Sequence, residues 1–333
     1  MSHPVSVSPP EPKPDSLRDV SICIAAYNES STIGRLLDQL IAVTDPVIDE
    51  VVVCANGCTD GTEAIVCEYM TRDPRVRLIS SPKGKPAAWN ALMSAARNDV
   101  RLFLDADVEL APGFFRHIRD ALTVNPASAI IAARDLPKRG PGRRSTLLAT
   151  FASRPFGFDY VSGRAYAFRL RKMPRPSCEP AQTDATHILN MPLDILHEDF
   201  WLEVAAGRSL IAFCPFAKIY YDPGTVDDLL KTRARLRVAR QQVAAMMPAK
   251  FAQWRRDSIR SHSFRRRLLF RFGTMDGPRD AIACVVGALS RWVLLAVFSK
   301  RVRSLESTMR SEMAEKGGQV VLASSGRLTK VVP

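Results

Sequence analysis

Two aspartates, Asp105 and Asp107, directly follow a mostly apolar run at residues 100–104. A short apolar run of this kind predicts a buried strand, and side chains at positions i and i+2 of a strand point to the same side. The two carboxylates therefore face one point, where their mutual repulsion favours a divalent cation with oxygen ligands. The spacing is also compatible with two solvated aspartates in a turn.

The elements that must position these aspartates are predicted by the first 135 residues. Strand–helix alternation with short connections is typical of a parallel, doubly wound α/β sheet, which binds ligands at the carboxyl ends of its strands. Ser30 or Ser31 is expected to cap the first helix and Asp60 the second. The predicted strands are 20–26, 50–55, 75–80, 100–104 and 127–133, and the predicted helices are 33–41, 61–70, one that opens near Pro86, and 112–123.

Beyond about residue 135 the alternation fades. A strand is predicted within 162–169, and short strands within 209–221. The remaining predicted segments are a helix that opens at 197–199, a basic helix at 225–247, a basic amphipathic stretch at 249–272 and an apolar run at 281–298.

The net charge of the chain is positive and is concentrated in one segment. The 333 residues are 46% hydrophobic and carry a net charge of +13. Thirteen Lys or Arg residues and one acid, Asp257, lie in residues 231–271, so this segment alone contributes +12. Nucleic acid, an anionic membrane surface and acidic substrates all remain open as partners. The seven cysteines show no metal-finger spacing, which predicts a reduced, cytoplasmic protein in which Cys23, Cys54 and Cys284 are core residues.

The order of the motifs resembles that of the family 2 glycosyltransferases, which have the GT-A fold. The resemblance covers about residues 20–240, and the order and spacing of the motifs carry it. The matching segments are Ala25–Glu29, Asn56–Thr62, Lys85 with Asn90, Asp105–Asp107, Ser162–Gly163 with Tyr166–Arg169, Glu198–Asp199, and a degenerate arginine motif at Thr232–Leu236.

The resemblance implies a site for a nucleotide-sugar donor, with a UDP-sugar favoured. Asn56 stands where the family usually has aspartate, which weakens the assignment of a uracil base, and Asn56-Gly57 is equally readable as a tight turn. Lys85 would lie near the diphosphate, or is a solvated lysine. The donor-binding residues implied by the resemblance are Ala26, Tyr27, Glu29, Asn56, Asp60, Lys85, Asn90 and Arg235.

The resemblance also implies the metal and the catalytic residues. Asp107 would coordinate Mn²⁺ or Mg²⁺, and Asp105 would hold the ribose or metal-bound water. Gly163 would line the acceptor side. Asp199 would be the catalytic base of an inverting reaction and Glu198 would shape the pocket, although an acid at a helix start also stabilises the helix dipole. A zinc helix is excluded, because its second histidine would stand at position 201, which is Trp201.

The sequence therefore predicts a GT-A domain with a C-terminal basic helical appendage. The predicted parts are a disordered Pro-rich leader (1–19), the catalytic domain (20–230), a basic helical, membrane-associating region (231–316) and a flexible tail (317–333). Thr232 and Leu236 replace the Gln and Trp of processive synthases, which argues for single addition of a hexosyl or N-acetylhexosaminyl group.

The predicted acceptor is a glycan or lipid-linked molecule at the cytoplasmic face of an anionic membrane. Residues 281–298 are expected to form an interfacial helix, a helix packed on the protein, or a single span. Three alternatives stay open: a sugar nucleotidyltransferase, a nucleic-acid-binding protein that uses residues 231–271, and an inactive family member. A nucleotidyltransferase needs a Gly-rich basic loop after the first strand, and Ala25–Ser31 has no Gly, Lys or Arg. Nucleic-acid binding would leave the acidic motifs unexplained.

Overall fold

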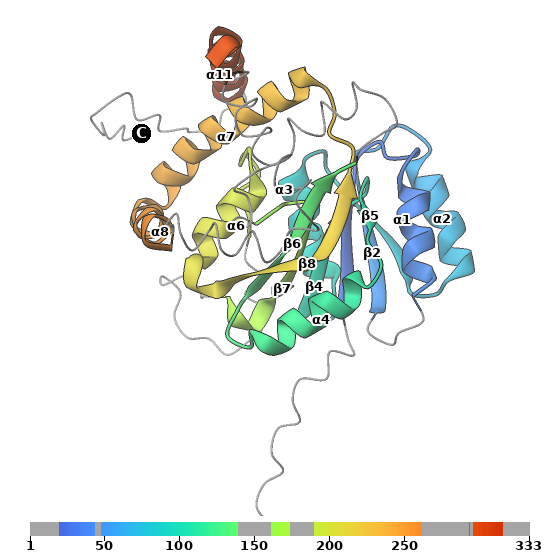
Figure 1. Cartoon of the computed structure of the whole chain (residues 1–333). Helices are drawn as coiled ribbons and strands as arrows, with labels where there is room; N and C mark the ends of the chain where they lie inside the picture. Colours follow the sequence, from blue (N-terminus) through green and yellow to red (C-terminus); the bar gives the residue numbers. More distant parts are fainter. Residues whose placement is uncertain are drawn as a thin grey trace, which may run out of the picture.

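The computed structural model describes residues 20–43, 48–138, 161–173, 190–261, 293 and 296–315. The strands of this part form one sheet in the order β3-β2-β1-β4-β7-β6-β8-β5 (Figure 1). The strands are β1 (Val20–Ala26), β2 (Ile48–Asn56), β3 (Val76–Ser81), β4 (Val100–Asp105), β5 (Glu109–Leu110), β6 (Ile130–Pro137), β7 (Ala165–Arg169) and β8 (Ile211–Tyr221). The helices are α1 (Ile33–Ile41), α2 (Thr62–Arg72), α3 (Lys85–Ala95), α4 (Phe114–Val124), α6 (Glu198–Ala206), α7 (Val226–Met246), α8 (Pro248–Ser261) and α11 (Ser299–Glu315).

The sheet is mostly parallel. Strands β3, β2, β1 and β4 run parallel to one another, and β8 runs parallel to β6. Strand β7 is antiparallel to both β4 and β6, and the short β5 is antiparallel to β8. The predicted α/β class with a mostly parallel sheet is confirmed.

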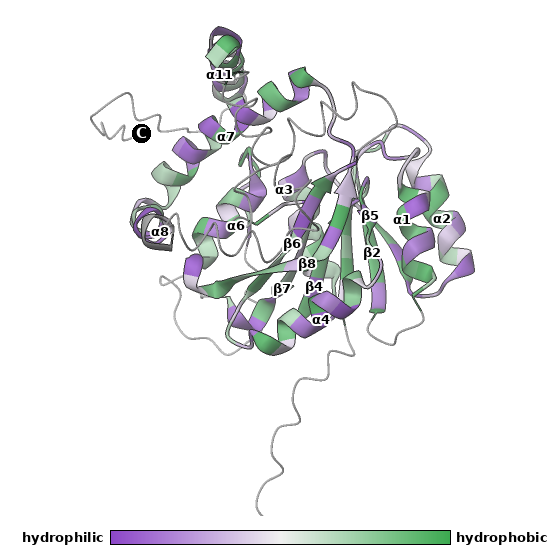
Figure 2. Cartoon of the chain, in the orientation of Figure 1, coloured by the Kyte–Doolittle hydropathy of each residue, from purple (hydrophilic) through white to green (hydrophobic). Residues whose placement is uncertain are grey.

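Alternating side chains divide the interior into two cores, one on each face of the sheet. Ile22 and Ile24 of β1 pack with α1, α2 and α4 on one face, whereas Cys23 between them packs with α3 and α6 on the other. The same alternation separates Leu102 from Phe103 in β4. This is the two-residue period of a strand that is buried on both faces. Figure 2 accordingly shows mostly hydrophobic residues along the central strands.

Buried arginines fix the carboxyl ends of two helices to the sheet. Arg101 donates to the Ala96 carbonyl at 3.1 Å at the end of α3. Arg169 donates to the Leu122 carbonyl at 2.6 Å and to the Asn125 carbonyl at 2.9 Å at the end of α4. The last carbonyls of a helix have no partner within the helix, so these guanidinium groups satisfy them and hold both helices in register with the strands.

Three local predictions differ from the structure. The residue that precedes α1 is Thr32 rather than Ser30 or Ser31, and its hydroxyl donates to Glu29 instead of capping the helix. Gly61 is the N-cap of α2, although Asp60 still accepts the Thr62 N–H at 3.0 Å. Residues 211–221 form one long strand, because β8 pairs with β6 on both sides of a register shift, rather than several short strands.

Helices α7, α8 and α11 form the described part of the C-terminal region. The predicted boundary at residue 230 lies inside α7, along which hydrophilic and hydrophobic residues alternate (Figure 2). Val302 of α11 packs on Leu230 and Ala234 of α7, and Arg301 pairs with Asp227 at 2.7 Å.

Several predictions lie outside the described residues. They are the leader (1–19), the tail (317–333), Cys284 and most of the apolar run 281–298. In the part of the chain that is described, no helix combines the length and apolar character needed to cross a membrane.

Candidate active site

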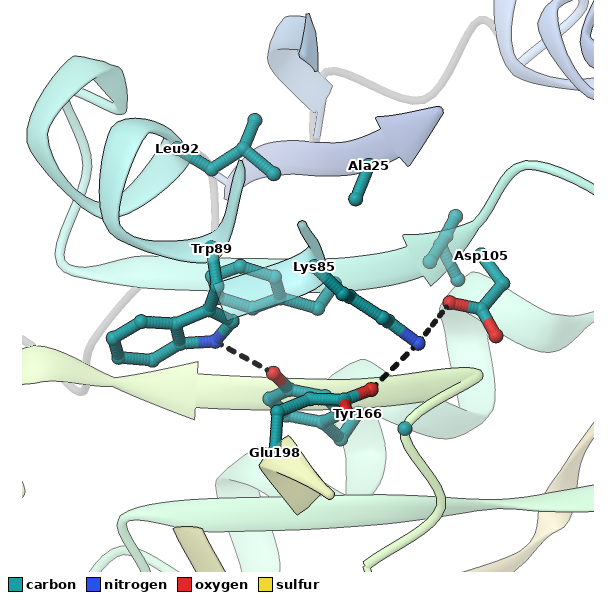
Figure 3. Close-up of a pocket in the computed structure, with 10 residues that line it drawn as sticks. Ala25, Lys85, Trp89, Leu92, Asp105, Tyr166 and Glu198 are labelled. Carbon is teal, nitrogen blue, oxygen red and sulfur yellow. Dashed lines mark hydrogen bonds and ion pairs between the residues drawn. The ribbon is translucent and has the colours of Figure 1, made fainter. Parts of the chain in front are cut away.

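Lys85 joins two acidic residues that are far apart in the sequence. Its Nζ lies 2.7 Å from Asp105 Oδ1 and 2.7 Å from Glu198 Oε1 (Figure 3). Asp105 is the last residue of β4, Lys85 is the first residue of α3, and Glu198 is the first residue of α6. A strand end and two helix starts therefore meet at the carboxyl edge of the sheet.

The fold explains why these side chains meet. Asp105 lies two positions after Phe103, whose ring faces the α3 side of the sheet, so the carboxylate faces the same side. Pro86 stands in the first turn of α3, where its missing N–H costs nothing, and the helix starts beneath the strand ends. The N-terminus of α6 carries Glu198 and Asp199 in its first turn, where the helix dipole favours negative charge.

Charge interactions dominate this cluster. Burial lowers the pKa of Lys85, but attraction from Asp105 and Glu198 outweighs burial and holds the pKa above its usual range. Burial raises the pKa of the Asp105 carboxyl, Lys85 opposes the rise, and the nearby Asp107 adds to it. Lys85 therefore stays cationic and offsets part of the negative charge.

The carboxylate of Asp199 is fixed on several sides. Oδ2 accepts the Gly163 N–H at 3.0 Å, and Oδ1 accepts the Phe200 N–H at 2.8 Å. The Nδ1 atom of His197, the residue before α6, also pairs with Oδ1. These hydrogen bonds hold the Asp199 carboxylate in one orientation beside the Gly163 peptide.

Aromatic residues form the floor of the cluster. The Trp89 Nε1–H donates to the Tyr166 hydroxyl at 2.8 Å, and the Phe103 ring stacks between the two, with its centroid 5.6 Å from that of Trp89 and 5.1 Å from that of Tyr166. Burial raises the pKa of Tyr166 well above its usual value, so its hydroxyl stays protonated. A small pocket lies between these rings and the ion pairs of Lys85 (Figure 3).

The loops after β1 and β2 are tied together beside this cluster. Asn28, which has a positive φ of 55°, accepts the Thr59 N–H at 2.8 Å. The Thr62 hydroxyl accepts the Glu29 N–H at 2.8 Å, and Asp60 Oδ2 accepts the Ser30 N–H at 3.1 Å. Asp60 therefore holds the two loops together. Because these hydrogen bonds form within the protein, the loops after β1 and β2 have a fixed arrangement at the edge of the sheet.

Glu29 and Asp107 extend the acidic cluster toward these loops. Burial raises the pKa of the Glu29 carboxyl, the Thr32 hydroxyl opposes the rise, and Asp107, Asp105 and Asp60 add to it. Within the described chain, no side chain forms a hydrogen bond or ion pair with the Asp107 carboxylate. An oxygen ligand without a partner, beside other carboxylates, is suited to Mg²⁺ or Mn²⁺.

Tyr27 directly follows β1, and Asn56 ends β2, the next strand along the edge toward β3. Tyr27 is partly exposed, and Lys83 Nζ lies 2.6 Å from its hydroxyl and 4.4 Å from the centroid of its ring. Asn56 is the buried last residue of β2. The motifs did not identify Lys83, because a single lysine in a polar turn carries no pattern.

Three residues of the predicted donor site have other surroundings. The Asn90 carboxamide accepts the Met191 N–H at 2.9 Å and donates to the Met191 carbonyl at 2.8 Å, so it anchors the segment before α6. Ala26 is fully buried, and its carbonyl accepts from the Cys58 thiol. Arg235 is an exposed residue of α7, whereas the ion pairs of Lys85 join residues of β4, α3 and α6.

Glu203 is a buried acid that the motif comparison missed. It lies one turn after Asp199 in α6 and accepts from the Trp254 indole of α8 and from Arg208, both at 2.9 Å. Its other oxygen accepts the Val161 N–H at 3.4 Å, two residues before Gly163. Glu203 thus connects α8 to the segment that holds Asp199. An acid with apolar residues on both sides, here Phe200–Leu202 and Val204–Ala206, is the signal that points to such a network.

The comparisons with known proteins agree with the predicted family. Residues 21–173 match the model of the glycosyl transferase family 2. Over 124 residues the chain is 29% identical to a dolichyl-phosphate beta-glucosyltransferase of Trichomonas vaginalis, which covers 33% of this chain and 37% of the relative. Over 96 residues it is 31% identical to a glucosyl-3-phosphoglycerate synthase of Mycolicibacterium paratuberculosis, which covers 27% of this chain and 29% of the relative. The chain therefore spans about a third of the length of these curated relatives.

Solved structures are similar at lower identity. The structure of glucosyl-3-phosphoglycerate synthase from Mycobacterium tuberculosis with Mn²⁺, UDP and glucosyl-3-phosphoglycerate is 19% identical. The match covers 74% of this chain and 87% of the synthase chain, with a TM-score of 0.46. The family match confirms the predicted resemblance to family 2 over residues 21–173.

Proposed function

Because residues 21–173 match the model of the glycosyl transferase family 2, we propose that the protein is an inverting, metal-dependent glycosyltransferase. It moves a hexosyl or N-acetylhexosaminyl group from a nucleoside-diphosphate sugar to a hydroxyl of a lipid-linked or polysaccharide acceptor. The observation that carries this proposal is the meeting of Asp105, Lys85 and Glu198 at the carboxyl edge of the sheet, with Asp199 fixed beside them. The dolichyl-phosphate substrate in the name of the Trichomonas vaginalis relative supports a lipid-linked acceptor.

In the proposed reaction Asp199 acts as the base, and the ion pair of Lys85 with Glu198 supports the pocket. Asp199 takes the proton from the acceptor hydroxyl, whose oxygen attacks the anomeric carbon from the face opposite the diphosphate. The bond between that carbon and the phosphate oxygen breaks, and the nucleoside diphosphate leaves with the electron pair. Lys85 and Glu198 keep the wall of the pocket in place through their ion pair.

The residues present fit a divalent cation. Asp107 offers a carboxylate without a partner in the described chain, and Asp105 and Glu29 lie within electrostatic range of it. Mn²⁺ or Mg²⁺ held by Asp107 would offset the negative charge on the departing diphosphate. Lys85 already neutralises part of the charge on Asp105, which leaves Asp107 as the principal ligand.

The decisive test separates donor binding from turnover. Calorimetry with UDP, GDP and MnCl₂ should show nucleotide binding that EDTA abolishes, and a panel of UDP- and GDP-sugars should identify a donor that releases nucleoside diphosphate. Asp199→Asn keeps the shape of the side chain but cannot take up a proton, so turnover should fall by about 10²–10⁴ while nucleotide binding is retained. Absence of nucleotide binding, or normal turnover of the variant, would contradict the proposal.

We further propose that the protein acts at the cytoplasmic face of an anionic membrane. The support is the basic charge of α7 and α8 and the exposed apolar residues Val293, Val297 and Phe298 before α11, next to Lys300. Each cation near an anionic surface contributes about 1 kcal/mol. Flotation should therefore recover the protein with vesicles of phosphatidylserine and phosphatidylcholine and not with phosphatidylcholine alone. Equal recovery with both vesicles would contradict this localisation.

A further inference from the structure

Lys83 and Tyr27 form a pair at the carboxyl edge of the sheet, beyond the ends of β1 and β3. The ammonium of Lys83 lies over the ring of Tyr27, 4.4 Å from the centroid, and 2.6 Å from the hydroxyl oxygen. Both side chains are partly exposed, so a ligand can reach the ring face and the cation together. An aromatic ring at the sheet edge offers a planar surface on which a nucleobase can stack.

The backbone of Lys83 is held in place by the loop after β2. Gly57 has a φ of +74°, and a Cβ built on it would lie 3.1 Å from Lys83 Cβ and 3.3 Å from Lys83 Cα. The loop therefore packs directly against the Lys83 main chain, which only a glycine at position 57 permits. The main chain of Lys83 is therefore fixed, and its side chain places the ammonium within reach of the Tyr27 hydroxyl.

The order of the strands sets the direction of a bound nucleotide. Strands β3, β2, β1 and β4 lie side by side, so the segment that follows β3 and contains Lys83 is the farthest of the four from Asp105 at the end of β4. The diphosphate belongs near the Asp105 and Asp107 end, where a divalent cation fits. The base then extends toward β3, and Lys83 meets the edge of the base that is farthest from the ribose.

We infer that Lys83 selects the base of the donor nucleotide, an inference that rests on the proposed nucleotide-sugar activity. An ammonium group has three donors and no acceptor. It therefore favours a base with a carbonyl at its far edge, which uracil has at position 4 and guanine has at position 6. Cytosine and adenine carry an amino group at these positions, and two donors then face each other.

Asn56 does not supply this discrimination. It ends β2 between Tyr27 and Lys83 along the sheet edge, and its carboxamide both donates and accepts. The same side chain can satisfy a carbonyl or an amino group after rotation by half a turn. The choice between the two classes of base is therefore left to the cation of Lys83.

Binding of matched nucleotide pairs tests the inference. Isothermal calorimetry of the full chain with MnCl₂ compares UDP with CDP, and GDP with ADP, since each pair differs in the carbonyl and amino groups at the far edge. A charge-assisted hydrogen bond predicts at least about tenfold tighter binding of UDP than of CDP. In Lys83→Met, which keeps the length of the side chain, this ratio should fall to about twofold or less.

The control is Arg72→Met, because Arg72 stacks on Tyr69 at the same 4.4 Å within α2, a helix that contributes neither Tyr27 nor Lys83. This variant should keep the wild-type ratio. Nucleotide binding whose UDP-to-CDP ratio is the same in wild type and Lys83→Met, or a wild type that prefers CDP, would overturn the inference and leave the proposed function standing. If none of the four nucleotides binds the wild type, the proposed function fails and this inference fails with it.

Discussion

Gly163 lies in direct contact with both acidic residues at the start of α6. Its N–H donates to Asp199 Oδ2 at 3.0 Å, and a Cβ at this position would lie 3.1 Å from Glu198 Oε1 and 3.3 Å from Asp199 Oδ2. These distances are shorter than ordinary contacts, so glycine is needed here for space. The peptide of Gly163 thereby fixes the position of Asp199.

Gly163→Ala should displace the two carboxylates by a few tenths of an ångström. Misplacement of a catalytic group lowers the rate steeply, so turnover should fall about tenfold or more with donor binding unchanged. Gly34→Ala is the matched control, since a Cβ at Gly34 in α1 would meet Tyr69 only at an ordinary 3.6 Å. Steady-state kinetics of both variants decide the point, and an unaffected Gly163→Ala enzyme would show that this close packing is unimportant.

The ion pair between Lys85 and Glu198 should contribute a measurable coupling energy. Lys85 is 39% exposed, so solvent screens the pair, whereas the Glu198 side chain is only 14% exposed. A double-mutant cycle with Lys85→Met and Glu198→Gln, followed by urea unfolding, should give a coupling of about 1 kcal/mol. The control cycle is Arg72 with Asp38, which are 46% and 58% exposed and should couple by about 0.3 kcal/mol or less. Equal couplings in the two cycles would contradict this expectation.

The sequence predicts the local elements better than their meeting points. The bounds of β1 were predicted correctly, because its residues are apolar except for Ser21 and lie between polar segments. Asp105 and Glu198 were each identified from their motifs, but their bridge through Lys85 depends on how α6 packs against the sheet, far along the chain from β4. Such a contact is set by tertiary packing, which no local pattern encodes.

Side chains with two plausible partners were the hardest to predict. An amide such as Asn90 can serve a ligand or the backbone, and in the structure it pairs with Met191. Lys83 had no motif, and its relation to Tyr27 appears only once the segment after β3 lies beside the loop after β1. Glu203 was detectable from its apolar neighbours in α6, since a buried acid must find hydrogen-bond donors.

Glu203 should make stability depend on pH. Burial raises the pKa of its carboxyl, while Arg208 and the Trp254 indole oppose the rise. A folded-state pKa above the unfolded value of about 4.5 means that the folded protein holds this proton more tightly. The stabilisation is present below about pH 4.5 and is lost as the pH rises through the folded pKa.

Glu203→Gln removes this titration. The free energy of unfolding of the variant relative to wild type should therefore improve as the pH rises from about 4.5 toward neutrality, whatever the offset from its altered hydrogen bonds. Urea unfolding at a series of pH values measures the slope. Glu63→Gln, at an exposed residue in the first turn of α2, serves as the control and should keep the wild-type slope. Parallel pH profiles for Glu203→Gln and wild type would contradict the prediction.

Asp107→Ala should separate metal-dependent binding from folding. Asp107 has no side-chain partner within the described chain, so the variant should unfold at the wild-type temperature without ligand. A nucleoside diphosphate with Mn²⁺ at a hundred times its dissociation constant should stabilise the wild type by about 2.7 kcal/mol. That stabilisation should disappear in Asp107→Ala and persist in Asp222→Ala, a change at an exposed residue after β8. Thermal unfolding with and without EDTA measures it, and equal metal-dependent stabilisation of Asp107→Ala and wild type would show that Asp107 does not hold the metal.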